Sequence, residues 1–127
     1  ELRKDSTDGV YNHLKYTINN NNTITITGMD NANDDTDVEL VIPAEIDGRK
    51  VTGIGDNAFS ECVNIKSIVM NAGLVEIGDY AFAGTSISEI DVPTTVTRIG
   101  RYAFAATPIT RITIDEGSIG IKLDGYA

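Results

Sequence analysis

The sequence contains no tryptophan, one cysteine and one histidine, and each shortage removes a class of chemistry. Cys62 has no partner for an internal disulfide and no second thiolate for a cysteine-based zinc site. His13 is the single imidazole, which excludes multi-histidine metal sites and disfavours a serine–histidine–acid triad. Glycine-rich phosphate loops and the nucleophile elbow G-x-S-x-G do not occur. We therefore predict a chain that is not an enzyme and that carries no cofactor.

Positive charge and long apolar runs are also scarce. Ten lysines and arginines stand against 19 aspartates and glutamates, which gives a net charge of −9. So acidic a chain lacks the electrostatic footprint of a nucleic-acid-binding protein and is poorly suited to hold an anionic membrane surface. No stretch approaches the roughly 18 consecutive apolar residues of a spanning helix. We expect neither nucleic acid binding nor membrane insertion.

Leucine and proline are rare, and the residues that replace leucine are informative. The 127 residues, a length that fits one domain, include 17 Ile and 14 Thr but 5 Leu, with 12 Gly and 3 Pro. β-branched side chains favour pleated, half-buried surfaces over long helices, and glycines favour tight turns. The composition predicts short strands joined by turns.

A hexapeptide of the form Ile-Gly-x-x-Ala-Phe recurs three times, at steps of 23 and 22 residues. Its copies occupy residues 54–59, 77–82 and 99–104. A second motif, apolar-x-x-apolar-x-apolar, recurs in phase and begins at Ile65, Ile87 and Ile109. A period of this length is typical of leucine-rich-repeat solenoids. The second motif ends in alternation, so each copy should supply one short strand that pairs in parallel with its neighbours.

The hexapeptide should turn the chain on the opposite wall of each coil. Gly supplies backbone freedom for the turn, and the small Ala lets the next coil approach closely. Asp56 and Asp79 can cap a short helical turn, a pattern that Arg101 breaks. The aromatic rings at the last position should stack as a ladder through the core. They belong to Phe59, Phe82 and Phe104.

The first copy has one extra residue between its phenylalanine and its strand. Cys62 consequently aligns with Thr85 and Thr107 of the later copies. No cationic cluster lies nearby in sequence to activate the thiol. We expect Cys62 to be a small buried side chain in the wall of the repeat.

These repeats resemble the BspA-like leucine-rich repeats of bacterial surface proteins, whose pattern is IGxxAFxxC…LxxIxIPxxVxxIG. The likeness covers roughly residues 38–114, although Ile largely replaces Leu and Asn71 stands where Pro is usual. The resemblance implies a solenoid with short parallel strands on one face and short helical turns or loops opposite. It also implies an extracellular or cell-surface setting in a bacterium, with a role in adhesion or host-protein binding.

We expect a single domain, 1–127, in three parts. Residues 1–50 should form an N-terminal hairpin cap and the first strand, and residues 51–114 the three leucine-rich repeats. Residues 115–127 should be a C-terminal cap or a truncated repeat, in which Ile121 stands where a fourth hexapeptide would begin. Caps are expected because a solenoid leaves an open apolar face at each end.

Two alternating runs near the N-terminus, 16–18 and 23–27, flank four consecutive asparagines. Asparagine tolerates left-handed backbone, so this segment predicts a hairpin loop. Ile24 and Ile26 should face the first repeat. The alternation of Val38, Leu40 and Ile42 indicates the strand of a preceding coil.

The densest acidic cluster lies at residues 30–37, and its carboxylates are weak candidates for a metal site. They are Asp30, Asp34, Asp35 and Asp37. The spacing does not fit an EF-hand, because Thr36 stands where glycine is needed and no glutamate follows at the twelfth position. We therefore interpret the segment as a solvated loop and predict no metal.

The residues between the buried strand positions should point outward and line up in columns. The candidate partner-binding residues are Ser67, Val69, Glu89, Asp91, Arg111 and Thr113. Solenoid curvature would make such columns an extended concave surface. Tyr80 and Tyr102 align in a further column, as exposed recognition aromatics or as rings packed between coils.

These observations favour a non-catalytic protein-interaction or adhesion module. Its partner would be a protein, for which the resemblance implies a host or matrix protein. The alternative is a structural spacer segment of a larger surface protein, with no ligand of its own. A third interpretation, an enzyme or sugar-binding protein that uses the acidic loop, requires a concave pocket with converging polar groups. The oligomeric state is not fixed by the sequence.

Overall fold

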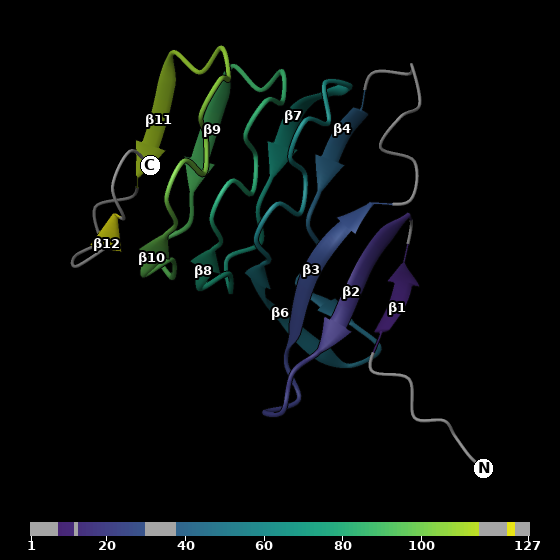
Figure 1. Cartoon of the computed structure of the whole chain (residues 1–127). Helices are drawn as coiled ribbons and strands as arrows, with labels where there is room; N and C mark the ends of the chain where they lie inside the picture. The colour runs from purple at the N-terminus through teal and green to yellow at the C-terminus, as the bar shows by residue number, and fades with distance from the viewer. Residues whose placement is uncertain (1–7, 12, 30–37, 115–121, 124–127) are drawn as a thin grey trace.

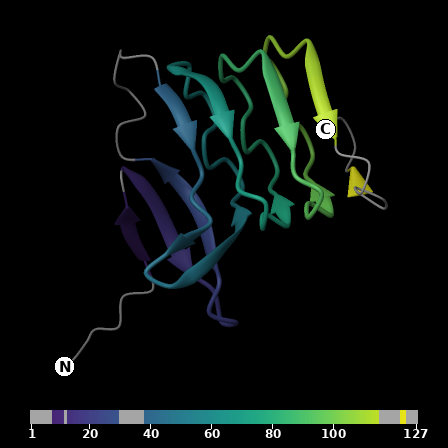
Figure 2. The same ribbon diagram turned by 180° about the vertical axis from the view of Figure 1, so that it is seen from behind.

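The computed structural model describes residues 8–11, 13–29, 38–114 and 122–123, and every regular element in these ranges is a β-strand (Figure 1). Two rows of short strands run along the molecule, and the chain passes from one row to the other in each coil. The same two rows are seen from behind in Figure 2. Buried isoleucines, leucines, valines and phenylalanines fill the space between the rows.

The first row is called the strand face here. It consists of β4 (Val38–Val41), β7 (Ile65–Val69), β9 (Glu89–Val92) and β11 (Arg111–Ile114). The second row consists of β6 (Arg49–Ile54), β8 (Glu76–Ile77), β10 (Arg98–Ile99) and β12 (Lys122–Leu123), paired in parallel in that order. The predicted parallel pairing of one strand per copy is found on the strand face, where β9 pairs with β11, whereas the second row of strands was not predicted.

Three antiparallel strands extend the second row at its N-terminal end. They are β1 (Asp8–Tyr11), β2 (Leu14–Ile18) and β3 (Ile24–Met29), and β3 also pairs in parallel with β6. The pair β2–β3 is called the hairpin below. The expected turn between β2 and β3 is confirmed, with Asn22 in left-handed backbone at φ 69°. Ile24 and Ile26 are fully buried and pair with Val51 and Ile54 of β6. β1 was not predicted.

A second hairpin, which was not predicted either, joins the strand face to the second row. β5 (Glu45–Ile46) pairs with the start of β6 in antiparallel register. Asp47 and Gly48 connect them with φ of 54° and 77°. Two consecutive positive φ values are those of a type I′ turn, for which Asp-Gly is a preferred sequence. This turn fixes the register with which β6 enters the second row.

Backbone hydrogen bonds that recur at the same positions of each repeat hold each coil to the next. The amide of Phe59 donates to the carbonyl of Ala81, and the amide of Phe82 to that of Ala103, both at 2.8 Å. The intervening amides close turns within their own coil, as when Ala81 donates to Gly78 at 3.3 Å. In the second hexapeptide the backbone amides of Gly78, Tyr80 and Phe82 therefore join coils, while that of Ala81 closes the turn.

The predicted phenylalanine ladder is confirmed. The ring centroids of Phe59 and Phe82 lie 5.4 Å apart with planes inclined by 13°, and those of Phe82 and Phe104 lie 5.6 Å apart with planes inclined by 2°. Phe59 and Phe82 are fully buried, whereas Phe104 is half-buried. The first two rings of the stack are thus shielded from solvent, and the third is partly open to it.

The hexapeptides form hydrogen-bonded turns, and within the described ranges the expected short helical turns are not present. The carboxylates of Asp56 and Asp79 therefore cap no helix of their own coil. Oδ1 of Asp56 accepts the amide of Asp79 at 2.7 Å, and Oδ1 of Asp79 accepts the amide of Arg101 at 2.8 Å. Each aspartate satisfies the same backbone position one coil further on. Arg101 interrupts the series because a guanidinium cannot accept a hydrogen bond.

The glycine of the hexapeptide is required because the backbone of the preceding coil approaches it closely. The expectation that this glycine supplies backbone freedom for the turn was wrong. A Cβ on Gly78 would lie 2.5 Å from Oδ1 and 2.7 Å from the amide nitrogen of Asp56. A Cβ on Gly100 would lie 2.5 Å and 2.6 Å from the same atoms of Asp79. The backbone of each coil occupies the space that a side chain would need.

Left-handed backbone occurs instead at two other positions of each coil, most of which carry a side chain. The residues and their φ values are Asn57 (60°), Tyr80 (58°) and Tyr102 (57°), then Glu61 (63°), Gly84 (76°) and Ala106 (56°). L-residues adopt this conformation at a cost of roughly 1–2 kcal/mol. The stacking of coils imposes it on tyrosine, glutamate and alanine.

The C-terminal end of the array departs from one expectation. Ile112 was expected to be buried but is 50% exposed, because β11 pairs with β9 on one side and is an edge strand among the described residues. Ile121 lies 22 residues after Ile99, but the residue that pairs with Ile99 is Leu123. The strand register therefore advances 24 residues at this step. The residues between β11 and β12 lie outside the described part of the chain.

We predict that Phe82→Ala lowers the free energy of unfolding by about 3–5 kcal/mol, because it opens a cavity between two stacked rings. Phe104→Ala should cost less, since Phe104 is half-buried. Denaturant unfolding of both variants measures the difference. A loss below about 1 kcal/mol for Phe82→Ala would contradict a buried ring ladder.

We also predict that Ala106→Gly raises the free energy of unfolding by about 0.5–1 kcal/mol. Relief of the left-handed strain exceeds the extra unfolded-state freedom of glycine, which is about 0.4–1 kcal/mol. Ala105→Gly is the matched control, because φ at Ala105 is not positive and the same exchange should destabilise. Equal effects of both substitutions on thermal unfolding would contradict backbone strain at Ala106.

Candidate interaction surface

The strand face presents the outward side chains of four neighbouring strands. β4 pairs in parallel with β7, and β9 with β11, while β7 and β9 lie side by side (Figures 1 and 2). Alternation along each strand buries Leu40, Ile68 and Ile90 and turns the intervening residues to solvent. The core positions thereby determine which residues a partner could reach.

The structure aligns the candidate partner-binding residues of β9 with those of β11, as the expected columns require, and places those of β7 on the neighbouring strand. Arg111 lies opposite Glu89, and Thr113 lies opposite Asp91. Five of the six are exposed, and Ser67 is half-buried. The exposed ones are Val69, Glu89, Asp91, Arg111 and Thr113.

Sequence reasoning missed the first member of each column. Glu39 lies opposite Ser67 and Val41 lies opposite Val69, and both additional side chains are exposed. Both residues alternate with the predicted strand positions at Val38, Leu40 and Ile42, so that pattern could have identified them. The strand face therefore extends over four coils.

Apolar and charged groups occupy different parts of this face. Val41 and Val69 are neighbours in register and are 55% and 52% exposed, so together they make an apolar patch on β4 and β7. Glu89 and Arg111 bring opposite charges to directly opposed positions on β9 and β11. A surface that combines an apolar patch with charges of both signs suits recognition of another protein.

A small hollow of about 250 Å³ divides the face between β7 and β9. One backbone bond, from the amide of Ser86 to the carbonyl of Ile65 at 3.0 Å, joins the two coils just before the hollow. Among the described residues, β4 and β7 form one two-stranded sheet and β9 and β11 form another. The hollow is lined by Lys66, Ser67, Ile68, Ser88, Glu89, Ile90 and Asp91. Polar side chains of two columns thus converge at the middle of the face.

The tyrosine column forms a stacked pair. The ring centroids of Tyr80 and Tyr102 lie 5.1 Å apart with planes inclined by 23°. Tyr80 is exposed and Tyr102 is half-buried. The two interpretations of this column are therefore both partly correct, since the rings pack between coils and one of them also faces solvent.

Cys62 is buried, as expected, and its thiol is poorly disposed to ionise. Burial raises the pKa of the Cys62 thiol above its ordinary value of 9.0, and the negative charge of Glu61 raises it further. The Cys62 Sγ lies 3.8 Å from the carbonyl oxygen of Ser60. In the later copies the hydroxyls of Thr85 and Thr107 donate to the carbonyls of Phe82 and Phe104 at 2.9 Å and 2.7 Å.

The remaining candidate groups form no metal site in the part of the chain that the structure describes. No three His, Cys, Asp or Glu side chains come together there as possible ligands. Asp30, Asp34, Asp35 and Asp37 lie outside the described residues. His13 is exposed in left-handed backbone, with φ of 68°.

No helix among the described residues combines the length and apolarity that crossing a membrane requires.

Comparison with family models matches residues 40–124 to the model described as BspA type leucine rich repeat region, in six copies. That match covers more than half of the chain. A comparison with curated proteins finds none that matches.

Several solved structures share this fold. A leucine-rich repeat protein from Bacteroides capillosus superposes with a TM-score of 0.60 at 20% identity, over 87% of this chain and 99% of that one. The pneumococcal vaccine antigen PcpA gives 0.62 at 19% identity, over 91% of this chain and 40% of its own. The T. pallidum leucine-rich repeat protein gives 0.53 at 16% identity, over 91% and 80%. At these identities the likeness concerns the fold.

We predict that the Cys62 thiol reacts slowly with a disulfide reagent at neutral pH and quickly after unfolding, because only the thiolate attacks. The raised pKa also means that the unfolded chain ionises first as pH rises. The native state should therefore lose stability above about pH 9, relative to Cys62→Thr. Reagent kinetics and denaturant unfolding at pH 7 and pH 10 measure both effects. Fast labelling of the native chain would refute the buried placement.

Proposed function

Because the chain belongs to the BspA-type leucine-rich repeat family, we propose that it is a non-catalytic protein-interaction or adhesion module of a bacterial cell-surface or secreted protein. The strand face is the surface that binds the partner. The observation that supports the proposal is the set of outward side chains on β4, β7, β9 and β11, which lie opposite one another within each of the pairs β4–β7 and β9–β11.

The proposed architecture is one domain with a solenoid of stacked repeats. In it, residues 51–114 are the repeats, and the hairpin within residues 1–50 covers the apolar end of the first coil. This assignment is supported by the burial of Ile24 and Ile26 and by the parallel pairing of β3 with β6. Residues 115–127 serve as the C-terminal cap or as a further, partial repeat.

The surface setting is supported by the family and by similarity in fold to a pneumococcal vaccine antigen. This chain spans less than half the length of that antigen. A protein partner is favoured because the face offers an apolar patch beside charged columns, without a deep pocket. Such extended surfaces are how repeat proteins commonly bind other proteins. A host or matrix protein is the partner that this setting favours.

The alternative is a structural spacer that holds other segments of a larger surface protein apart. It is favoured by the observation that the repeated residues are those that stack the coils, whereas the strand-face residues differ from one coil to the next. A spacer needs the stacking alone. The two functions differ in whether changes on the strand face have any consequence.

The test is binding of the whole chain to a panel of immobilised host matrix proteins at low salt, measured by surface plasmon resonance. We expect Val69→Asp to raise the dissociation constant at least about tenfold, because binding of the partner would then bury a carboxylate in the apolar patch. Val63→Asp is the matched control, since Val63 is 63% exposed in the turn before β7 and lies outside both columns. Absence of binding to the whole panel would favour the spacer.

A further inference from the structure

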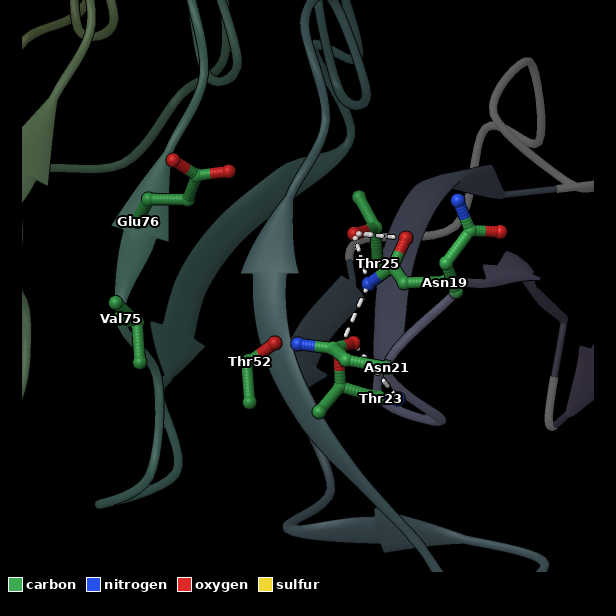
Figure 3. A pocket seen from close by; sticks show the side chains of 8 residues that line it. Asn19, Asn21, Thr23, Thr25, Thr52, Val75 and Glu76 are labelled. Carbon is green, nitrogen blue, oxygen red and sulfur yellow. Dashed lines mark hydrogen bonds between the residues drawn. The ribbon is translucent and has the colours of Figure 1, made fainter.

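A second hollow, of about 460 Å³, lies away from the strand face, beside the loop between β2 and β3 (Figure 3). Its walls come from three parts of the chain: the hairpin, β6 and the start of β8. Its lining residues are Asn19, Asn20, Asn21, Thr23, Thr25, Thr52, Val75 and Glu76. In size it falls within the range of small-molecule sites.

A glycine leaves space between two of the lining residues. Thr25 of β3, Gly53 of β6 and Glu76 of β8 lie side by side in register. A Cβ on Gly53 would lie 3.2 Å from the Thr25 Oγ1 and 3.7 Å from the Glu76 Cγ. Any larger side chain at Gly53 would therefore fill the space between Thr25 and Glu76.

A β-bulge adds a polar group to the same place. Ile24 pairs with Val51 but Thr25 pairs with Gly53, which leaves Thr52 as the extra residue on β6. A bulge re-aims side chains, and here Thr52 joins the lining of the hollow beside Gly53. Figure 3 shows Thr52 and Asn21 extending toward one another across the opening.

The hairpin wall is preorganised by its own hydrogen bonds. The Asn19 side-chain amide donates to the hydroxyls of Thr23 and Thr25, each at 3.0 Å. The Thr23 hydroxyl donates to Oδ1 of Asn21 at 2.6 Å. On the adjoining loop, Arg49 Nε donates to Oδ1 of Asn22 at 2.8 Å. A wall that is already ordered loses less conformational freedom when a ligand binds.

The lining defines the chemistry of a ligand. Amides and hydroxyls both donate and accept hydrogen bonds, and Glu76 adds a carboxylate that accepts. The eight lining residues include no cationic side chain, which disfavours an anionic ligand, and one apolar side chain, Val75. The backbone of β3, β6 and β8 is already paired, so an extended peptide could not add as a strand here.

We propose that this hollow binds a neutral saccharide unit. Its hydroxyls would exchange hydrogen bonds with Asn21, Thr52 and Glu76, and its C–H groups would lie against Val75. The site is separate from the strand face, so the inference does not depend on the function proposed above. The same chemistry could come from a free sugar or from a residue within a polysaccharide.

The test begins with the whole labelled chain on an array of neutral and uronic-acid-containing oligosaccharides. Each neutral hit is then titrated, alongside the methyl glycoside of its terminal sugar, into ¹⁵N-labelled chain followed by NMR. We expect shifts in the side-chain amides of Asn19 and Asn21 and in the backbone amides of Thr52 and Glu76. Binding of the methyl glycoside indicates recognition of a single sugar, and binding of the oligosaccharide alone indicates recognition within a chain.

Glu76→Ala should lower the affinity for the neutral sugar about tenfold, through loss of a hydrogen bond to a charged acceptor. Gly53→Ala should also lower this affinity, because the added methyl group narrows the space between Thr25 and Glu76. Glu45→Ala, which removes an exposed glutamate of β5 that lies outside the hollow and outside the strand face, is the matched control and should leave the affinity unchanged. Absence of neutral hits, stronger binding of uronic acids, shifts confined to the strand face, or equal loss in Glu45→Ala would each overturn the proposal.

Discussion

The close approach of each coil's backbone to the next is the constraint on which the structure depends. It is tightest where the backbone of Asp56 fills the space beside Gly78, and where that of Asp79 fills the space beside Gly100. At this separation the amides of Phe59 and Phe82 reach the carbonyls of the following coil, and the phenylalanine rings meet face to face. The repeated residues are those that tolerate or exploit this contact.

The same constraint separates structural positions from positions available for function. Side chains that stack are repeated, whereas those that face solvent on β4, β7, β9 and β11 are free to differ between coils. The strand face is made of such variable positions, and the hollow beside the hairpin draws most of its lining from residues outside the repeats. A fold of this kind supports different partners because recognition requires no change in the stack.

Much of the stack could be predicted from the sequence, and the reasons for the failures are physical. A strict repeat fixes which side chains meet, so the phenylalanine ladder and the strand-face columns followed from spacing alone. The hollow could not be predicted, because it depends on the bulge at Thr52 and on the register of Gly53 between two strands that are distant in sequence. The roles of Gly78 and Asp56 were misassigned because each acts on a neighbouring coil, and the local sequence suggests action within its own turn.

Amide hydrogen exchange measured residue by residue tests the account most directly. If equivalent amides join successive coils, those of Phe59 and Phe82 should exchange slowly and with similar opening free energies, close to that of global unfolding. The amides of Asn20 and Asn21 in the hairpin loop should exchange quickly in the same experiment. Exchange at Phe59 and Phe82 as fast as in that loop would contradict the stacking of coils.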